Sequence, residues 1–403
     1  MNKLPDGWTE YKLKDIMSIS SKRYNPNKDT KNYKCIELEH IESETGILNG
    51  HTNSKDIHSV KNVFEKGEVL YGKLRPYLKK FYLAKFDGVC SSEIWVLKGK
   101  KVINDFLYYF IQQDNFNYIA NVSIGMIMPR ADWSYMSEIS FNIPPLDEQK
   151  RIASALSKID AYLENTIKLI EEKERFKRGI AKKLLTCKEG ENIPEARFKG
   201  FEDEWKEYNL SKIGVSYNGL RNKKANSFVE NCNAKYITYK SVYDKNKIDI
   251  NRLGNVFIGK NENQNLVKYG DIFFTISSET PDEVAISSVL LDEVENTYLN
   301  SFCFGFRFDF NILLPEFARY YFRSDYIRKS TYRLAQGITR YNISKKKFLD
   351  IIIYLPSIEE QEKIGGYLSL LDEEIDNLKK QKELIKEMKR GAMEKLLSGE
   401  VRL

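Results

Sequence analysis

An internal repeat constrains the fold of this chain more than any other feature, because two copies of one framework should fold alike. Near the start of each copy the residues recur 197 positions apart, with Trp8, Glu10, Tyr11, Leu13 and Ile16 returning as Trp205, Glu207, Tyr208, Leu210 and Ile213. Later the offset is 212, as from Glu148 to Glu360, and the repeated residues are Tyr108-Tyr109-Phe110, Gly125, Pro144, Glu148-Gln149, Asp160, Arg178-Gly179 and Lys183-Leu184-Leu185. The second copy therefore carries about 15 additional residues in its interior.

The interior of each copy differs from that of the other. Similarity fades between about residues 20 and 100 in the first copy and between about 215 and 315 in the second. Two like frameworks with unlike interiors favour the recognition of two unlike targets. The alternative is that the interiors are surface loops that have diverged without a role in recognition.

Each copy ends in a sequence with the pattern of a long helix. Residues 147–185 contain no proline and one glycine, and prolines precede both helices at Pro144, Pro145 and Pro356. Apolar residues recur in steps of three and four, which is typical of a coiled-coil seam. These positions are Ile152, Leu156, Ile159, Leu163, Ile170, Ile180 and Leu184, and then Ile364, Leu368, Leu371, Ile375, Leu378, Ile385 and Leu396. We expect the two helices to pair antiparallel within one chain; pairing between two chains of a dimer is the alternative.

Short strands bounded by turns precede each helix. Residues 67–70 and 270–276 each read as a glycine and an acidic residue followed by apolar residues, and 94–97 and 302–308 alternate as strands do. The sequence predicts an α+β protein with two tandem domains that have β-rich cores, separated by two long helices forming an antiparallel coiled coil. The predicted segments are a first domain at 1–144, a central helix at 145–186, a linker at 187–199, a second domain at 200–355 and a C-terminal helix at 356–403.

Composition narrows the class of protein. The formal net charge of +7 indicates, weakly, a polyanionic partner such as nucleic acid. The five cysteines are scattered and form no Cys-x-x-Cys pair, so we expect free thiols rather than disulfides or a zinc site. No apolar stretch is long enough for a membrane span, and no secretory signal opens the chain. We therefore expect a cytoplasmic protein with no membrane partner.

The motifs that could carry catalysis are incomplete. Gly67 and Gly72-Lys73 have the spacing of a phosphate-binding loop, but Leu74 stands where magnesium would need a hydroxyl. Asn142-Ile143-Pro144-Pro145 is interrupted relative to the Asn-Pro-Pro-aromatic element of adenine methyltransferases. The three histidines, His40, His51 and His58, have no accompanying pattern of cysteine or carboxylate ligands. We predict no catalytic residues and no metal site in this chain.

A segment that mixes cations with aromatic rings is the best candidate for contact with DNA. Lys73, Arg75, Tyr77, Lys79, Lys80 and Tyr82 lie within ten residues of one another, a mixture suited to phosphate contacts with packing against sugars or bases. The alternative is a solvated surface loop. Arg130 late in the first domain, and Arg340, Tyr341 and Lys345 late in the second, occupy corresponding places and complete the predicted DNA-binding set: Lys73, Arg75, Tyr77, Lys79, Lys80, Arg130, Arg340, Tyr341 and Lys345.

The chain resembles the specificity subunits of type I restriction–modification enzymes along almost its whole length. The resemblance lies in the two tandem copies, the helix entries Pro144-Pro145-Leu146-Asp147-Glu148-Gln149 and Leu355-Pro356-Ser357-Ile358-Glu359-Glu360-Gln361, the segment from Pro194 through Arg197-Phe198 and Gly200-Phe201 to Trp205, and the closing Leu396-Leu397-Ser398-Gly399. The departures from the family fall in the interiors, where its members vary, so they leave the target sequence open.

The resemblance implies a non-catalytic DNA-recognition subunit. Each domain would bind half of a bipartite, asymmetric site in double-stranded DNA through the major groove. The helix pair would dock two methyltransferase subunits, which use S-adenosylmethionine, and two motor-nuclease subunits that use ATP and Mg²⁺ would complete a restriction complex. The chain itself would hold no cofactor. A stand-alone DNA-binding scaffold or decoy without methyltransferase partners is the alternative, and a nuclease or methyltransferase in its own right conflicts with the incomplete motifs.

Overall fold

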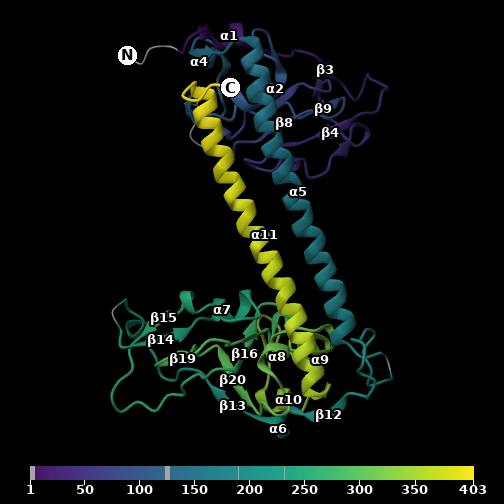
Figure 1. Ribbon diagram of the computed structural model, residues 1–403, viewed down its shortest axis with the longest axis vertical. Coiled ribbons are helices and arrows are strands. Elements are labelled where there is room, and N and C mark those ends of the chain that lie inside the picture. The colour runs from purple at the N-terminus through teal and green to yellow at the C-terminus, as the bar shows by residue number, and fades with distance from the viewer. Residues whose placement is uncertain (1–4, 123–127, 189, 231) are drawn as a thin grey trace. The chain divides into compact units, whose positions relative to one another are not determined.

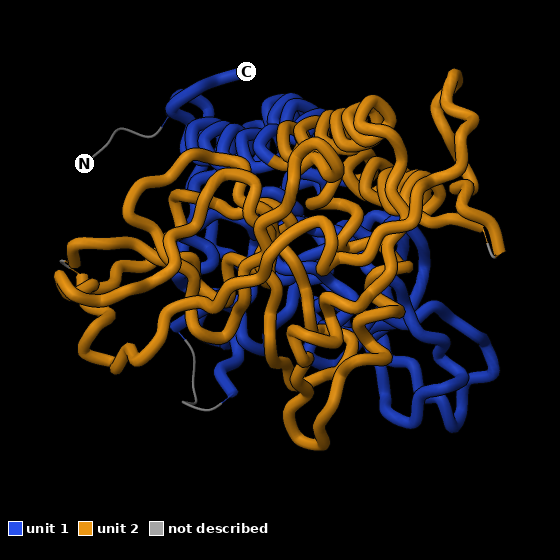
Figure 2. Tube along the Cα trace, turned by 90° about the horizontal axis from the view of Figure 1, so that it is seen from below, with its two compact units in different colours: residues 1–167, 380–403 blue, residues 168–379 orange. Residues whose placement is uncertain are grey.

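The computed structural model describes residues 5–122, 128–188, 190–230 and 232–403. The chain divides into two compact units, which Figure 2 distinguishes by colour. Unit 1 comprises residues 1–167 and 380–403, and unit 2 comprises residues 168–379. Gly125, one of the repeated residues, lies outside the described residues. Each unit thus contains the strands and short helices of one copy of the repeat together with part of each long helix.

Within its described residues, unit 1 contains three sheets and four short α-helices. A two-stranded sheet pairs β1 (Thr9–Lys12) with β11 (Ser140–Ile143), and a four-stranded sheet has the order β2 (Met17–Ile19), β10 (Ile94–Gly99), β7 (Val69–Gly72) and β8 (Phe81–Leu83). A five-stranded sheet has the order β3 (Arg23–Tyr24), β6 (Lys61–Phe64), β9 (Gly88–Cys90), β4 (Lys34–Ile36) and β5 (Thr52–Asn53). The helices are α1 (Leu13–Ile16), α2 (Asn104–Phe110), α3 (Asp114–Ala120) and α4 (Trp133–Met136).

Unit 2 repeats the framework with a different additional sheet. The equivalent pair is β12 (Lys206–Asn209) with β22 (Ile352–Leu355), and the equivalent four-stranded sheet has the order β13 (Gly214–Asn218), β20 (Cys303–Phe308), β16 (Ile272–Thr275) and β18 (Ser287–Val289). The remaining strands form a three-stranded sheet, β15 (Gly254–Val256), β14 (Ala234–Ile237) and β19 (Thr297–Leu299), and a short pair, β17 (Ser277–Ser278) with β21 (Tyr341–Asn342). The helices are α6 (Leu210–Ile213), α7 (Tyr239–Asp244), α8 (Pro315–Tyr321), α9 (Asp325–Leu334) and α10 (Lys345–Leu349).

The two long helices are α5 (Leu146–Leu185) and α11 (Ile358–Ser398), drawn teal and yellow in Figure 1. In unit 1 the start of α5, including Ile152 and Leu156, shares a core with the end of α11, including Met393 and Leu396. In unit 2 the end of α5 and the start of α11 share a core in the same way. In each unit the two helices therefore run antiparallel, and the predicted α+β fold with an antiparallel helix pair is confirmed. The bounds of the five predicted segments remain a prediction.

The repeated Glu-Gln pair explains how each long helix is joined to its unit. The Gln149 amide accepts a hydrogen bond from the Ile103 backbone N–H at 3.0 Å and donates to the Pro144 carbonyl oxygen at 2.9 Å. Gln361 does the same, accepting from Leu314 at 2.9 Å and donating to the Pro356 carbonyl at 3.0 Å. Both glutamines are buried, so each satisfies backbone groups that would otherwise be unpaired.

The two glutamates, which are also buried, each bind an arginine that follows the other helix. Arg402, after α11, binds Glu148, with an Nη2–Oε2 distance of 2.7 Å. Arg197, after α5, binds Glu360 in a bidentate pair at 2.9 and 2.7 Å. We call the attachment of each long helix to its unit a joint. Each joint needs both copies of the repeat, because an arginine of one copy neutralises the buried glutamate of the other.

Ion pairs between the two long helices also connect a residue of one copy with a residue of the other. In unit 1, Lys389 of α11 forms an ion pair with Asp160 of α5 at 2.7 Å. In unit 2, Lys177 of α5 pairs with Asp372 of α11. The offset of 212 relates both the two lysines and the two aspartates, so the ion pairs occupy equivalent places.

Within the described ranges, no helix is both long enough and apolar enough to cross a membrane.

Candidate nucleic-acid interface

The segment 73–80 of unit 1 is a structured turn between β7 and β8. Its backbone is left-handed at Arg75 and Lys79, with φ of 52° and 46°, an unusual conformation for residues with a side chain. Pro76 between them is buried, and the Lys73 N–H donates to the Glu93 carbonyl at 2.9 Å. The turn is therefore attached to the unit at both ends rather than free in solvent.

The side chains of this turn differ in how available they are. Arg75 and Tyr77 are exposed, Tyr77 by 54%, and Arg75 forms no ion pair within the part of the chain that the structure describes. Lys79 forms an ion pair with Asp114 at 3.2 Å, and the Lys80 ammonium donates to the Leu38 carbonyl at 2.6 Å. Arg75 and Tyr77 are thus the residues best placed to contact a partner.

Arg130, distant in sequence, lies beside this turn. The backbones of Leu74 and Arg130 form an antiparallel bridge, and the Arg75 N–H donates to the Pro129 carbonyl at 2.8 Å. The Arg130 guanidinium makes a bidentate contact with Glu93 at 3.0 and 3.1 Å. These hydrogen bonds lower the pKa of the Glu93 carboxyl and raise that of Arg130. The structure therefore brings the first six predicted contacts together, with Arg130 already paired.

The predicted residues of unit 2 occupy an equivalent place. Tyr341 lies in β21, where it is paired with Ser278 of β17. This short pair corresponds to the Leu74–Arg130 bridge of unit 1, because position 342 is 212 residues after Arg130. Arg340 precedes β21, is exposed, and has no ion pair among the described residues.

Lys345 is the first residue of α10. Its ammonium donates to the side-chain oxygen of Asn218, at the end of β13. Partial burial, with a smaller contribution from the nearby positive charge of Arg221, lowers the pKa of Lys345. Arg221 therefore adds a cation close to Lys345.

The sequence did not indicate several residues of these surfaces. Glu93, Asn218 and Arg221 contact or neighbour predicted cations, but each is distant from them in sequence and carries no motif. Tyr82 of β8, which belongs to the basic-aromatic segment, is buried in a core of unit 1 and cannot be part of an exposed surface. The offset of 212 relates Arg130 to Asn342 of β21, so the repeat was the signal in the sequence that linked these two surfaces.

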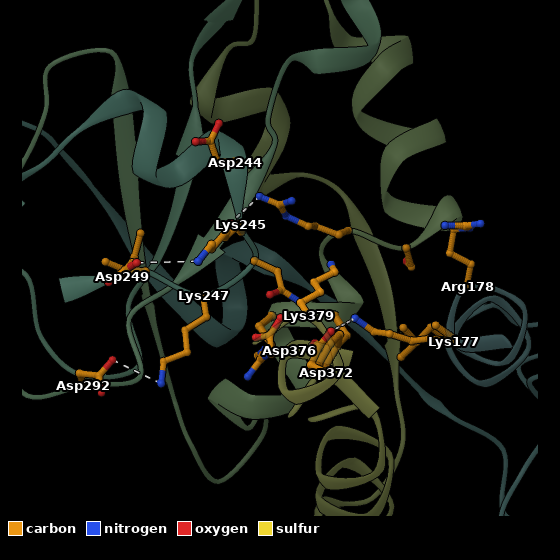
Figure 3. A pocket seen from close by; sticks show the side chains of 18 of the residues that line it. Lys177, Arg178, Asp244, Lys245, Lys247, Asp249, Asp292, Asp372, Asp376 and Lys379 are labelled. Atoms are coloured by element: carbon orange, nitrogen blue, oxygen red, sulfur yellow. Dashed lines mark hydrogen bonds and ion pairs between the residues drawn. The ribbon is translucent and has the colours of Figure 1, made fainter. Parts of the chain in front are cut away.

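Unit 2 also contains a cleft of about 1010 Å³ beside the long helices (Figure 3). Side chains of both signs line it and pair with one another, including Lys247 with Asp292 at 3.4 Å and Arg319 with Asp372 at 3.1 Å. None of the predicted DNA contacts is among its lining residues. Across the described ranges, no group of three or more histidine, cysteine, aspartate or glutamate residues is arranged to hold a metal ion.

Comparison with known proteins identifies the family. Residues 5–172 and 202–387 each match the type I restriction modification DNA specificity domain. The chain belongs to this family. The match occurs once in each copy of the repeat, and together the two matches cover most of the chain.

Individual relatives agree with the family match. The MjaVIII type I restriction enzyme specificity subunit of Methanocaldococcus jannaschii is 28% identical over 367 residues, which cover 87% of this chain and 80% of that protein. The putative MjaX specificity subunit of the same organism is 24% identical over 425 residues and covers 100% of this chain and 96% of its own.

Solved structures share the fold. A chain from a study of complex assembly and conformational transition of the type I R-M system has a TM-score of 0.62 at 18% identity, covering 100% of both chains. The type I restriction-modification S subunit from M. genitalium has a TM-score of 0.54 at 18% identity, covering 98% of this chain and 97% of its own. At these identities the likeness establishes the fold.

Proposed function

We propose that this chain recognises a bipartite, asymmetric site in double-stranded DNA, one half through each unit. The observation that carries the proposal is that the DNA specificity domain occurs twice, on equivalent frameworks with different additional sheets. Unit 1 adds a five-stranded sheet, whereas unit 2 adds a three-stranded sheet and a short two-stranded pair, and the turns predicted to contact DNA differ in their side chains. Different recognition surfaces read different base sequences, so the two half-sites should differ.

We further propose that the long helices bind methyltransferase subunits. The helices bury one apolar seam and leave other large apolar residues exposed. In unit 1 these are Leu146, Tyr162, Leu384 and Met388, and in unit 2 they are Leu169, Phe176 and Leu370. Exposed apolar residues repeated along helices are typical of surfaces that pack against partner helices.

Catalysis and its cofactors belong, in this proposal, to the partners. S-adenosylmethionine would be bound by two methyltransferase subunits, and ATP with Mg²⁺ by two motor-nuclease subunits. This chain would supply only the choice of site, in the cytoplasm. The incomplete phosphate-binding and methyltransferase motifs of the sequence support this division.

The test combines the purified chain, DNA and a labelled methyl donor, with and without a cognate methyltransferase subunit. We expect methyl transfer only when both proteins are present. Sequencing of the methylated DNA should reveal one motif with two different halves. Exchange of residues 20–100 for those of another family member should change one half only.

Two outcomes would contradict the proposal. Methyl transfer by the chain alone, lost on mutation of one of its own residues, would make it an enzyme. A hybrid whose motif changed in both halves, or in neither, would mean that the units do not read DNA independently.

A further inference from the structure

A five-residue loop of unit 2 presents an isoleucine almost completely to solvent. Ile338 is 93% exposed, the largest value for any large apolar side chain among the described residues. It lies in the loop 337–341, which follows α9 and whose last residue, Tyr341, is the first residue of β21. A side chain so exposed contributes little to the core, so its apolar character calls for another explanation.

The loop is held in one conformation by its own backbone. Gln336 and Asn342 exchange two backbone hydrogen bonds of 2.9 and 2.8 Å across its base. Gly337 has a φ of +143°, and a Cβ atom at this position would lie 1.9 Å from the Arg340 carbonyl oxygen, so only glycine fits. Ile343, just beyond the loop, is buried in the core of unit 2. Because the loop is already ordered, binding through Ile338 would cost little conformational entropy.

The neighbours of Ile338 favour DNA as its partner. Arg340, two residues later, is exposed, and the exposed Lys346 and Lys347 follow in α10. The loop lies within residues 202–387, which match the DNA specificity domain. An apolar side chain flanked by cations suits a base edge bordered by phosphates.

On these grounds we propose that Ile338 recognises a T·A base pair through an apolar contact with the thymine methyl group; the proposal rests on the function proposed above. The 5-methyl group of thymine is the apolar feature that distinguishes this base pair in the major groove. Arg340 would bind the adjacent phosphate backbone and position the loop. Ile338 is thus assigned as a specificity-determining residue of the second half-site.

The experiment uses the chain in complex with a cognate methyltransferase subunit. Methylation is measured on a duplex library that carries every single-base change in the motif. The variant is Ile338→Ala, and the matched control is Ile352→Ala, an isoleucine of unit 2 that is exposed on β22. We expect Ile338→Ala to reduce the preference for T·A at one position by about four-fold, the value of one buried methyl group, and to leave the others unchanged.

A second measurement isolates the methyl group. Duplexes carrying deoxyuridine in place of thymine at that position lack only the methyl group. The wild-type complex should methylate them about four-fold less efficiently, as expected for the loss of one buried methyl group. The Ile338→Ala complex should show no further loss, because the contact is already absent.

The outcomes separate this inference from the proposed function. If the wild type shows a two-part motif and Ile338→Ala leaves every base preference unchanged, the inference fails and the proposed function stands. Equal weakening at all positions, or relaxation at a G·C pair, also overturns it. If the wild type shows no sequence preference, the proposed function fails and this inference fails with it.

Discussion

The two units use the same residues to join their long helices but different residues at the surfaces predicted to contact DNA. At the joints, Glu148 and Glu360 occupy equivalent buried positions, and each binds an arginine of the other copy. At the predicted surfaces, Arg130 of unit 1 is bound to Glu93, whereas Arg340 of unit 2 projects without an ion pair among the described residues. A buried glutamate that is bound to an arginine can be replaced by few residues without loss of stability, whereas the residues of an exposed turn can change at little cost.

The joints themselves are not identical. The Arg402 side chain is 41% exposed, while that of Arg197 is 12% exposed. The indole N–H of Trp8 donates to Glu148 at 3.2 Å, but the indole N–H of Trp205 has no hydrogen-bond partner within the described structure. The unit 2 joint therefore depends more on its ion pair, and the unit 1 joint divides its stability among more contacts.

The largest expected effect comes from breaking the unit 2 joint. Glu360→Ala should destabilise the protein by about 3–5 kcal/mol, because it leaves Arg197 charged and nearly buried without a partner. Glu148→Ala should cost less, since Arg402 remains hydrated. Chemical denaturation measures both, with the exposed Glu359→Ala as the control. Equal losses of stability in Glu360→Ala and Glu148→Ala would contradict the proposed difference between the two joints.

A double substitution tests whether the unpaired charge causes the loss of stability in Glu360→Ala. Glu360→Leu combined with Arg197→Met removes both charges together, so no unpaired ion remains in the joint. The double variant should recover most of the stability lost in Glu360→Ala, because a buried ion pair contributes little beyond an apolar pair of similar size. If the double variant is as unstable as Glu360→Ala, the cost lies in packing rather than in the unpaired charge.

The indole hydrogen bond predicts a smaller difference. Trp8→Phe and Trp205→Phe remove similar ring volume, but only the first also removes a hydrogen bond to a carboxylate. Trp8→Phe should therefore lower the free energy of unfolding by about 1 kcal/mol beyond the loss of packing. Trp205→Phe should lower it by the loss of packing alone, because it removes an unpaired donor. Thermal unfolding of the two variants provides the comparison. A larger loss for Trp205→Phe would contradict it.

The predicted DNA contacts should differ in salt dependence. Arg340→Ala should reduce the slope of log K against log salt by about 0.9, the value for one phosphate contact. Arg130→Ala should change the slope less, because Arg130 is already neutralised by Glu93. Glu93→Ala serves as the reciprocal variant and should strengthen binding by releasing Arg130. A reduced affinity in Glu93→Ala would show that this ion pair positions the turn instead.

The smallest effect concerns titration of Glu93. Its folded pKa is lowered by the hydrogen bonds from Arg130, so its stabilising contribution is complete above the ordinary carboxyl pKa. That contribution is lost as the pH falls through the lowered folded value. Arg130→Ala should return the Glu93 pKa toward its ordinary value, which an NMR titration can follow. An unchanged pKa would mean that Arg130 and Glu93 do not interact in solution.

The sequence by itself determined the framework. The repeat and the steps of three and four predicted two equivalent units and an antiparallel helix pair, because helical periodicity depends on residues close in sequence. Of the predicted seam residues, Ile152, Leu156, Ile364 and Leu368 are almost fully buried. The doubled Glu-Gln pair was also visible, although the sequence did not show which arginines complete it.

Only the tertiary structure decided which charged residues are available. Lys79, Lys80 and Arg130 have the same charge as Arg75 and Arg340 in the sequence, yet the fold pairs the first three with Asp114, the Leu38 carbonyl and Glu93. It likewise buries Tyr82 and exposes Ile338. Contacts between residues tens of positions apart depend on how strands and turns pack, and no local pattern records that packing.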